Sequence, residues 1–418
     1  MTIWFETDDL LAHFDWDLHP TGIQRVALAI IGEALAQRRD SVGVCRLSRH
    51  SGRLSPLDAS AFWAQCAEPP PYCRATPLRI ARFLARHGTR RIGDHVRGVA
   101  DERALAARLA PGDVLVCLGL PWRNPDYGRQ VAAAKRRYGL RFALLIHDVL
   151  PLSDPRYFAP GFVAAFARWF DAALPVCDTV LVGSSHVADA VRASCRARGF
   201  SPPAIARVVF GAGVGAAGKP AALQREVRDP FVLCVSTFGG RKNHALLLRV
   251  WRRLLDTHGP DRIPALVLVG TGGQRAAIAD GIERAKLGGK IVIAPAVGDS
   301  ELRELYRRCL FTVYPSLSEG WGLPIAESLM HGRFCVASNA ASLPEVGGDL
   351  VDYFDPENDD DAADKIGRAV FDRDYLASRS ARVAAEYRAP SWRDCADAVL
   401  RAVETPSAGV EKSVGSLA

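Results

Sequence analysis

A regular alternation of short apolar runs with longer helical patterns restricts the fold of this chain more than any other feature. The apolar runs span four or five residues and are rich in β-branched side chains, as is typical of strands buried on both faces. We expect strands at 2–5, 42–46, 114–118, 142–146, 179–182, 206–210, 231–235, 265–269, 290–293, 311–314 and 334–337. Strands that alternate with helices predict an α/β protein with parallel sheets covered on both faces.

The expected elements form two series of similar size, which predicts two doubly wound domains. A stretch rich in Gly, Ala and Pro (211–230) separates them, and 418 residues suffice for two cores. It contains a GxGxxG pattern from Gly213, but Pro220 and the lack of a suitably spaced acidic residue favour a linker over a dinucleotide site. We expect a first domain at 1–213, a linker at 214–229, a second domain at 230–388, a helix at 390–404 that packs back on the first domain, and a disordered tail at 405–418.

The cysteines and the N-terminus bear on the compartment. The ten cysteines are scattered singly without a CxxC pair, which favours a reducing environment over a disulfide framework. The N-terminal MTIWFETDDL lacks the basic and apolar regions of a secretory signal, and no apolar run approaches the ~18 residues of a spanning helix. We therefore expect a cytoplasmic protein.

The net charge of +7 has one conspicuous source, an arginine-rich segment. Seven arginines lie between residues 74 and 97 against a single acid, Asp94. Two interpretations stay open: a solvated face, or a surface that contacts anionic lipid or a phosphate-bearing substrate. No nucleic-acid-binding motif accompanies the charge, so we expect no nucleic acid partner.

A basic turn follows the strand expected at 231–235. In STFGGRKNH (236–244), two glycines precede Arg241 and Lys242, and a helix is expected from about Asn243. Cations are unfavourable at the positive end of a helix, whereas cations and helix N–H groups together attract phosphate. The segment thus favours a phosphate site over two solvated side chains.

Two further loops follow strands of the same series. Gly270 opens the turn GTGG, in which the backbone can approach a ligand closely. Val297 lies in the loop after the strand expected at 290–293, where a planar base could rest. Asp299 and Ser300 are candidates for the N-cap of the next helix.

The segment SEGWGLPIAES (318–328) sets two glutamates eight positions apart. Pro324 suits the first turn of a helix, which places Glu319 in a loop and Glu327 in the first or second helical turn. An acid/base pair, a metal site and a grip on a polyhydroxylated ligand are the three interpretations. A metal would need further ligands, and His331 lies away from the glycine loop. A helix N-terminus favours ionised Glu327, which suits an acceptor for hydroxyl groups, so the third interpretation is favoured.

Together these segments resemble the retaining GT-B glycosyltransferases of family 4, the glycosyl transferases group 1. EGWGLPIAE resembles their E-x7-E motif, STFGGRKNH their phosphate loop, and ASNAASLPEVGGDLVDYFDPEN (337–358) the continuation. Ser236 stands where glycine is usual, and Gly240 replaces the common proline. The resemblance covers residues 230–388 and implies the GT-B fold, in which two Rossmann-like domains face each other across a cleft.

The resemblance also implies roles for the residues of the second domain. Arg241 and Lys242 would bind the donor diphosphate, Glu327 the nucleotide ribose, and Glu319 the transferred sugar. Further donor contacts are expected from Gly320, Trp321, Gly322, Leu323, Val297 and Gly270. By the resemblance, the cationic groups of the donor site would neutralise the leaving diphosphate. We therefore expect no metal and no cofactor besides the nucleotide-sugar co-substrate.

The first domain offers candidates for the acceptor side. Gly22 opens a helix, and Arg25 follows one turn later. His147 and Asp148 follow one expected strand directly, and Ser184 follows another. HDVLP resembles the HDxxP of mannosyltransferase-like members, in which the histidine contacts the donor sugar. The resemblance therefore adds His147 to Glu319, Arg241 and Lys242 as candidate catalytic residues.

We expect a retaining glycosyltransferase that moves a hexose to a lipid-linked or polysaccharide acceptor in cell-surface glycan biosynthesis, such as that of lipopolysaccharide. GDP-mannose is the preferred donor. Two alternatives stay open: a UDP- or dTDP-sugar used on a soluble acceptor, and a catalytically silent scaffold that binds nucleotide sugar. Residues 74–97 are the candidate for peripheral contact with the inner face of an anionic membrane.

Overall fold

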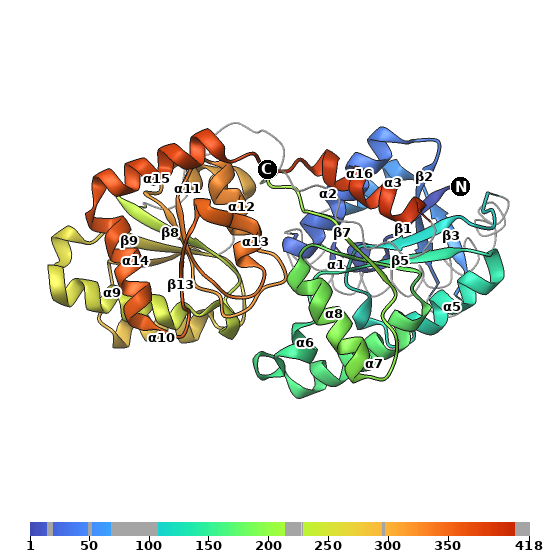
Figure 1. The fold of residues 1–418 in the computed structure, drawn as a ribbon, viewed down its shortest axis with the longest axis horizontal. Helices are drawn as coiled ribbons and strands as arrows, with labels where there is room; N and C mark the ends of the chain where they lie inside the picture. The colour runs from blue at the N-terminus through green and yellow to red at the C-terminus, as the bar shows by residue number, and fades with distance from the viewer. Residues whose placement is uncertain are drawn as a thin grey trace, which may run out of the picture. The chain divides into compact units, whose positions relative to one another are not determined.

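In the computed structural model the chain forms two compact units (Figure 1). The structure describes residues 1–14, 20–48, 52–67, 108–213, 227, 229–294 and 297–405. Unit 1 comprises Met1–Gly183, Val187–Phe210 and Ser391–Ala418, and unit 2 comprises Ser184–His186 and Gly211–Pro390. The arginine-rich segment, most of the expected linker and nearly all of the expected tail lie outside the described residues.

Unit 1 is built on a sheet with the strand order β3-β2-β1-β4-β5-β6-β7. Its strands are β1 (Ile3–Glu6), β2 (Val42–Leu47), β3 (Leu54–Leu57), β4 (Val114–Cys117), β5 (Arg141–Ile146), β6 (Thr179–Val182) and β7 (Ala204–Arg207). Its helices are α1 (Asp8–Phe14), α2 (Gly22–Gln37), α3 (Ala59–Ala67), α5 (Tyr127–Tyr138), α6 (Leu150–Ser153), α7 (Pro160–Ala173), α8 (Ser185–Ala197) and α16 (Trp392–Glu404). The C-terminal helix α16 packs against α2.

Unit 2 is built on a sheet with the strand order β10-β9-β8-β11-β12-β13, in which every pair is parallel. Its strands are β8 (Phe231–Val235), β9 (Ala265–Val269), β10 (Ile291–Ala294), β11 (Thr312–Tyr314), β12 (Cys335–Ser338) and β13 (Asp352–Phe354). Its helices are α9 (His244–His258), α10 (Arg275–Arg284), α11 (Asp299–Arg308), α12 (Leu323–Met330), α13 (Leu343–Gly347), α14 (Asp359–Phe371) and α15 (Arg373–Glu386).

Both faces of the unit 2 sheet are buried, as the apolar runs predict. Along β8, Val232 and Cys234 pack into one core cluster, while Phe231 and Leu233 pack into another. Successive strand side chains point to opposite faces, so one continuous apolar run serves two layers of helices. In Figure 1, α9 and α10 lie on one side of this sheet and α11, α12 and α15 on the other.

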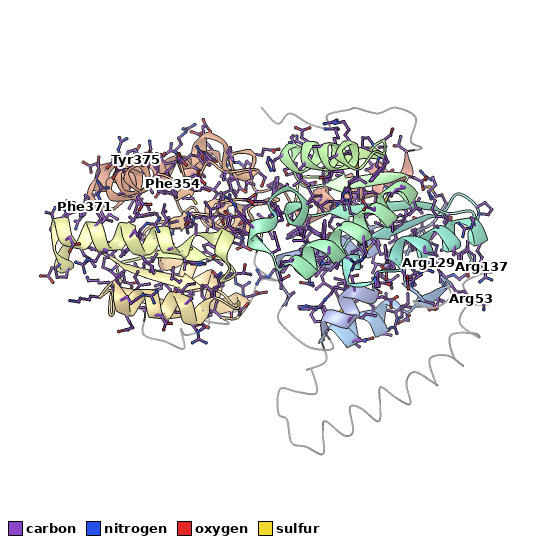
Figure 2. All side chains as sticks on the ribbon, turned by 90° about the horizontal axis from the view of Figure 1, so that it is seen from below. Arg53, Arg129, Arg137, Phe354, Phe371 and Tyr375 are labelled. Carbon is purple, nitrogen blue, oxygen red and sulfur yellow. The ribbon has the colours of Figure 1, made fainter. Side chains whose placement is uncertain are left out.

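The helices bury one stripe and expose the other. On α5 of unit 1, Val131 and Ala134 are fully buried, whereas the side chain of Arg129 is 77% exposed. Figure 2 shows Arg129 and Arg137 pointing away from the core of unit 1. None of the helices in the described part of the chain is long and apolar enough to cross a membrane.

Three strands differ from the prediction. The edge strand β3 pairs antiparallel with β2, so the unit 1 sheet is not wholly parallel, and β13 adds a strand that was not expected. The strand expected at 206–210 is β7, which starts and ends earlier because it pairs residue by residue with β6. Val208 and Phe210 lie beyond the paired residues but are buried. Their burial accounts for the apolar pattern that extended the expected strand to residue 210.

The turn after β9 depends on glycine. Gly270 has φ of +155°, and a Cβ built there would lie 1.9 Å from the carbonyl oxygen of Ser236. The loops after β8 and β9 therefore run close together, joined by a 2.7 Å hydrogen bond from Phe238 N to Thr271 O. By contrast, a Cβ on Gly273 would meet no atom within 4 Å.

We expect Gly270→Ala to lower the free energy of unfolding by at least about 2 kcal/mol, because the alanine is strained and its Cβ meets backbone. Gly273→Ala is the matched control and should change stability by less than about 0.5 kcal/mol. Urea unfolding of both variants checks this, and equal effects at the two positions would contradict the role assigned to Gly270.

Candidate functional site

The Glu319 carboxylate of unit 2 gathers the basic turn and the loop after β11. Its Oε2 accepts a hydrogen bond from Arg241 at 2.7 Å, and its Oε1 accepts from Lys242. Oε1 also accepts from the Tyr314 hydroxyl at 2.9 Å and from Ser316 Oγ at 2.7 Å. Two cations and two hydroxyl groups thus converge on one carboxylate at the carboxyl edge of the sheet, where ligands bind in open α/β sheets.

Burial and charge act in opposite directions on Glu319. Burial alone would raise its pKa, since the residue is only 7% exposed. The neighbouring Lys242 and Arg241, helped by the hydrogen bond from Ser316, outweigh burial and lower the pKa from 4.5 to about 2. Glu319 therefore stays ionised near neutral pH and cannot serve as a general acid there.

Backbone contacts hold the two loops in place. Leu317 N donates to Arg241 O at 2.8 Å, which ties the turn after β8 to the loop after β11. Ser342 Oγ lies 2.9 Å from the carbonyl oxygen of Glu319 and 2.7 Å from that of Trp321. Arg241 and Lys242 sit on a 3-10 turn (Gly240–Lys242), and α9 begins only after Asn243, which has a left-handed φ of +53°.

Glu327 lies on α12 and is 4% exposed. Its Oε2 accepts a hydrogen bond from the hydroxyl of Tyr306 at 2.9 Å. Tyr306 comes from α11 and was not among the residues expected from the sequence. His331, considered above as a metal ligand, instead stacks its ring on Tyr306, with centroids 5.3 Å apart and planes 11° apart.

The other expected donor-site residues lie in the loop before α12, at the start of α12 and in the loop before α11. Gly320, Trp321 and Gly322 are buried, and Gly322 has φ of +144°. Leu323 is half-buried as the first residue of α12. Val297 is half-buried in the loop before α11. The helix cap expected at Asp299 is shifted by one residue, because Gly298 occupies the N-cap and Asp299 is already helical.

In unit 1, the His147 side chain is buried directly after β5. Its Nε2 lies 2.8 Å from the carbonyl oxygen of Leu118, which requires the proton on Nε2 and leaves Nδ1 as the acceptor. Burial lowers the pKa of His147 to about 4, so the imidazole is neutral near pH 7. Asp148 Oδ1 accepts from the backbone N of Leu150, the first residue of α6, at 3.1 Å.

The remaining acceptor-side candidates lie at the start of α2 and in the loop after β6. Gly22 is exposed as the first residue of α2, and Arg25 is half-buried one turn further on. Thr21 precedes them, and its backbone N donates to Gln24 Oε1 at 3.1 Å across the helix start. Ser184 is fully buried after β6 and groups with unit 2 rather than with the rest of the preceding strand.

Unit 1 also contains an acidic cluster that the sequence did not indicate. Glu6 and Cys117 end the neighbouring strands β1 and β4, and their ligand atoms lie within 4.8 Å of a carboxylate oxygen of Asp9. Glu6 accepts from Asp8 N at 2.8 Å and from the Tyr127 hydroxyl at 3.2 Å. Burial raises the pKa of Asp9 to about 6 and that of Glu6 well above its ordinary range. Among the residues that the structure describes, this is the one group with metal-compatible spacing, and it does not involve Glu319 or Glu327.

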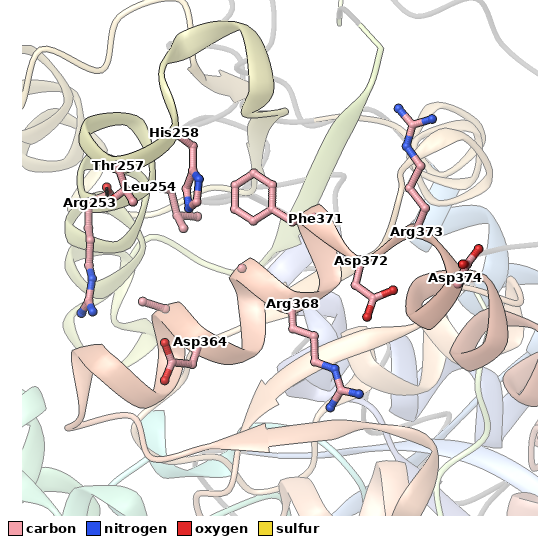
Figure 3. Close-up of a pocket in the computed structure, with 12 residues that line it drawn as sticks. Arg253, Leu254, Thr257, His258, Asp364, Arg368, Phe371, Asp372, Arg373 and Asp374 are labelled. Carbon is pink, nitrogen blue, oxygen red and sulfur yellow. Dashed lines mark hydrogen bonds between the residues drawn. The ribbon is translucent and has the colours of Figure 1, made fainter.

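A groove of about 930 Å³ lies on unit 2 between α9 and α14 (Figure 3). His258 and Phe371 face each other there with ring centroids 4.1 Å apart. Both residues end their helices, and α9 and α14 each start after a strand's carboxyl end. The groove therefore lies toward the amino ends of the strands, whereas Glu319 lies at their carboxyl ends, and the groove is not part of the Glu319 cluster.

Comparisons with known proteins give the family that unit 2 matches. Residues 219–387 match the family described as Glycosyl transferases group 1. The chain is 32% identical over 172 residues to O-antigen chain mannosyltransferase B of Escherichia coli, covering 41% of this chain and 45% of the relative. It is 29% identical over 174 residues to the serotype-specific mannosyltransferase WbdA of Escherichia coli, covering 40% and 21%. The chain thus spans less than half the length of these relatives.

Solved structures resemble the chain over nearly its whole length. Sucrose-phosphate synthase of Thermosynechococcus elongatus is 18% identical with a TM-score of 0.62, covering 96% of this chain and 98% of that one. HepE of Anabaena, solved in complex with UDP and glucose, is 15% identical with a TM-score of 0.59, covering 97% and 100%. At this identity the likeness shows the fold alone, which is the predicted GT-B class of two Rossmann-like domains.

The low pKa of Glu319 predicts a pH-dependent contribution to stability. A folded pKa of about 2 against an ordinary 4.5 stabilises the folded state at pH 7 by about 3 kcal/mol, at about 1.4 kcal/mol per pKa unit. This contribution is fully present above about pH 4.5 and is lost as the pH falls toward 2. We therefore expect Glu319→Gln to be destabilised by about this amount at pH 7, with the gap narrowing below pH 4.5.

Urea unfolding at a series of pH values between 7 and 3 measures this gap. Glu386→Gln is the control, because Glu386 makes an exposed pair with Arg382 and its loss should cost less than about 1 kcal/mol. A gap for Glu319→Gln that stays constant down to pH 3 would show that the ion cluster does not stabilise the folded state as described.

Proposed function

We propose that the protein is a retaining glycosyltransferase that transfers mannose from GDP-mannose to a lipid-linked or polysaccharide acceptor. The convergence of Arg241 and Lys242 on Glu319, within a glycosyl transferases group 1 domain, carries this proposal. Two cations held side by side suit the diphosphate of a nucleotide sugar. The mannosyltransferase names of the relatives at 32% and 29% identity support the choice of sugar and of a cell-surface glycan pathway.

In this scheme the leaving diphosphate binds Arg241 and Lys242. Their charge takes the place of a metal ion, so the proposed reaction needs none. Glu327 accepts hydrogen bonds from the ribose hydroxyls, and backbone N–H groups of the loop around Gly320 and Gly322 hold the sugar. Binding energy from these distant groups orients the anomeric carbon for attack.

The chemistry follows from the protonation states in the cluster. Glu319 is ionised and engaged by four donors, so it does not supply a proton. We assign the proton acceptor to the leaving group. The bond from the anomeric carbon to the phosphate oxygen breaks, and the acceptor oxygen forms its bond on the same face. The acceptor proton passes to the departing phosphate oxygen, and the attack on the same face gives retention.

A nucleotide-release assay tests the enzymatic proposal. Wild-type protein, kept in EDTA, is screened with GDP-mannose and with UDP- and dTDP-sugars, in the presence of lipid-linked and soluble glycans. We expect turnover with GDP-mannose, and a loss of at least about a hundredfold in Lys242→Ala, the size expected when a group that stabilises developing charge is removed. Lys365→Ala, on α14, is the matched control and should keep wild-type turnover.

Each failure has a separate meaning. Turnover with a UDP- or dTDP-sugar instead would overturn the choice of GDP-mannose, and strict dependence on Mn²⁺ would overturn the metal-free mechanism. If nucleotide sugars bind without being consumed, the protein is a binding scaffold and the enzymatic proposal fails.

A further inference from the structure

Tyr306 is a large polar side chain placed entirely inside unit 2. It is 0% exposed, yet its hydroxyl donates to Glu327 Oε2 at 2.9 Å. Buried tyrosine hydroxyl groups need a partner, and a carboxylate is a strong one, because the hydrogen bond is charge-assisted. This contact joins α11 to α12. The first helix follows the loop that contains Val297, and the second follows the loop that contains Glu319.

The ring of Tyr306 is held as firmly as its hydroxyl. His331 stacks against it at 5.3 Å between centroids and 11° between planes. His331 lies one helical turn after Glu327, and its backbone N donates to Glu327 O at 3.1 Å. One short helix thus presents both the carboxylate that binds the tyrosine hydroxyl and the ring that covers the tyrosine face.

A second set of contacts fixes α12 against α11 and against the strand β11. The Arg333 side chain, just after α12, donates to the carbonyl oxygen of Arg307 near the end of α11. Ser328 lies next to Glu327, and its Oγ accepts a hydrogen bond from the Thr312 hydroxyl at 2.7 Å. The same Oγ donates to the carbonyl oxygen of Arg333 at 3.0 Å. The position of Glu327 relative to Tyr306 is therefore set by packing and backbone, and the hydrogen bond adds the orientation of the carboxylate.

We propose that Tyr306 is a positioning residue that orients the Glu327 carboxylate for the ribose hydroxyls of the nucleotide. This inference rests on the proposed function, since it assumes that Glu327 binds ribose. Tyr306 donates a hydrogen bond to Oε2 and fixes the plane of the carboxylate, while His331 holds the plane of the tyrosine ring. The tyrosine touches neither the sugar nor the reacting atoms and acts through Glu327.

A ligand-and-mutant cycle tests the assignment on the full chain. Calorimetry measures the affinity of wild type, Tyr306→Phe and Glu327→Gln for GDP and for 2′,3′-dideoxy-GDP, which lacks the ribose hydroxyls. We expect wild type to bind GDP about tenfold more tightly than the dideoxy analogue, the size of one charged hydrogen bond. In Tyr306→Phe and in Glu327→Gln this ratio should fall below about threefold, with the affinity for the dideoxy analogue nearly unchanged.

Tyr375→Phe is the matched control. It removes another tyrosine–carboxylate hydrogen bond of unit 2, to Asp352, and should keep the wild-type ratio. A wild-type ratio in Tyr306→Phe, together with a collapsed ratio in Glu327→Gln, would overturn the positioning role while leaving the ribose role intact. A ratio near one in wild type would instead overturn the ribose role of Glu327. A loss of affinity in Tyr306→Phe that is equal for both ligands would identify a purely structural role and also contradict the inference.

Discussion

The buried ionised carboxylate of Glu319 is the constraint on which the candidate site depends. A charge at 7% exposure is unstable inside a protein unless it is paired and hydrogen-bonded. Lys242, Arg241, Tyr314 and Ser316 satisfy that requirement, and in doing so they fix the turn after β8 against the loop after β11. Two long cationic side chains are thereby ordered before any ligand arrives, which would reduce the entropy cost of binding the proposed diphosphate.

The two glutamates of the 318–328 segment have different environments and therefore different capacities. Glu319 faces cations, which keep it ionised and engaged. Glu327 accepts a hydrogen bond from the hydroxyl of Tyr306, which ties this carboxylate to α11. A carboxylate can accept hydrogen bonds from several hydroxyl groups, whereas a carboxylate between two cations is suited to holding those cations. The two environments therefore fit the proposed binding of one anionic, hydroxyl-rich ligand better than they fit an acid/base pair.

The sequence predicted most of the strands because a strand buried on both faces is a continuous apolar run, as in β8 and β9. It missed β3, which contains Pro56 and joins the edge of the sheet, and β13, which has only three residues. Motifs identified Arg241, Lys242, Glu319 and Glu327 individually, but the ion cluster among the first three depends on how two loops meet in space. Tyr306 sits in the helical segment ELRELYRR, where its local pattern marks only a core position. The acidic cluster of Glu6, Asp9 and Cys117 could not be predicted from the sequence either, because it joins segments that are more than 100 residues apart.

We propose that Arg241 and Lys242, held by Glu319, form a diphosphate site. The most direct test is the affinity of the wild-type chain for GDP compared with GMP, measured by calorimetry at low and at high salt. We predict that GDP binds at least about tenfold more tightly than GMP, and that the difference shrinks as salt screens the two cations. Equal affinities for GDP and GMP at low salt would show that Arg241 and Lys242 do not form a diphosphate site.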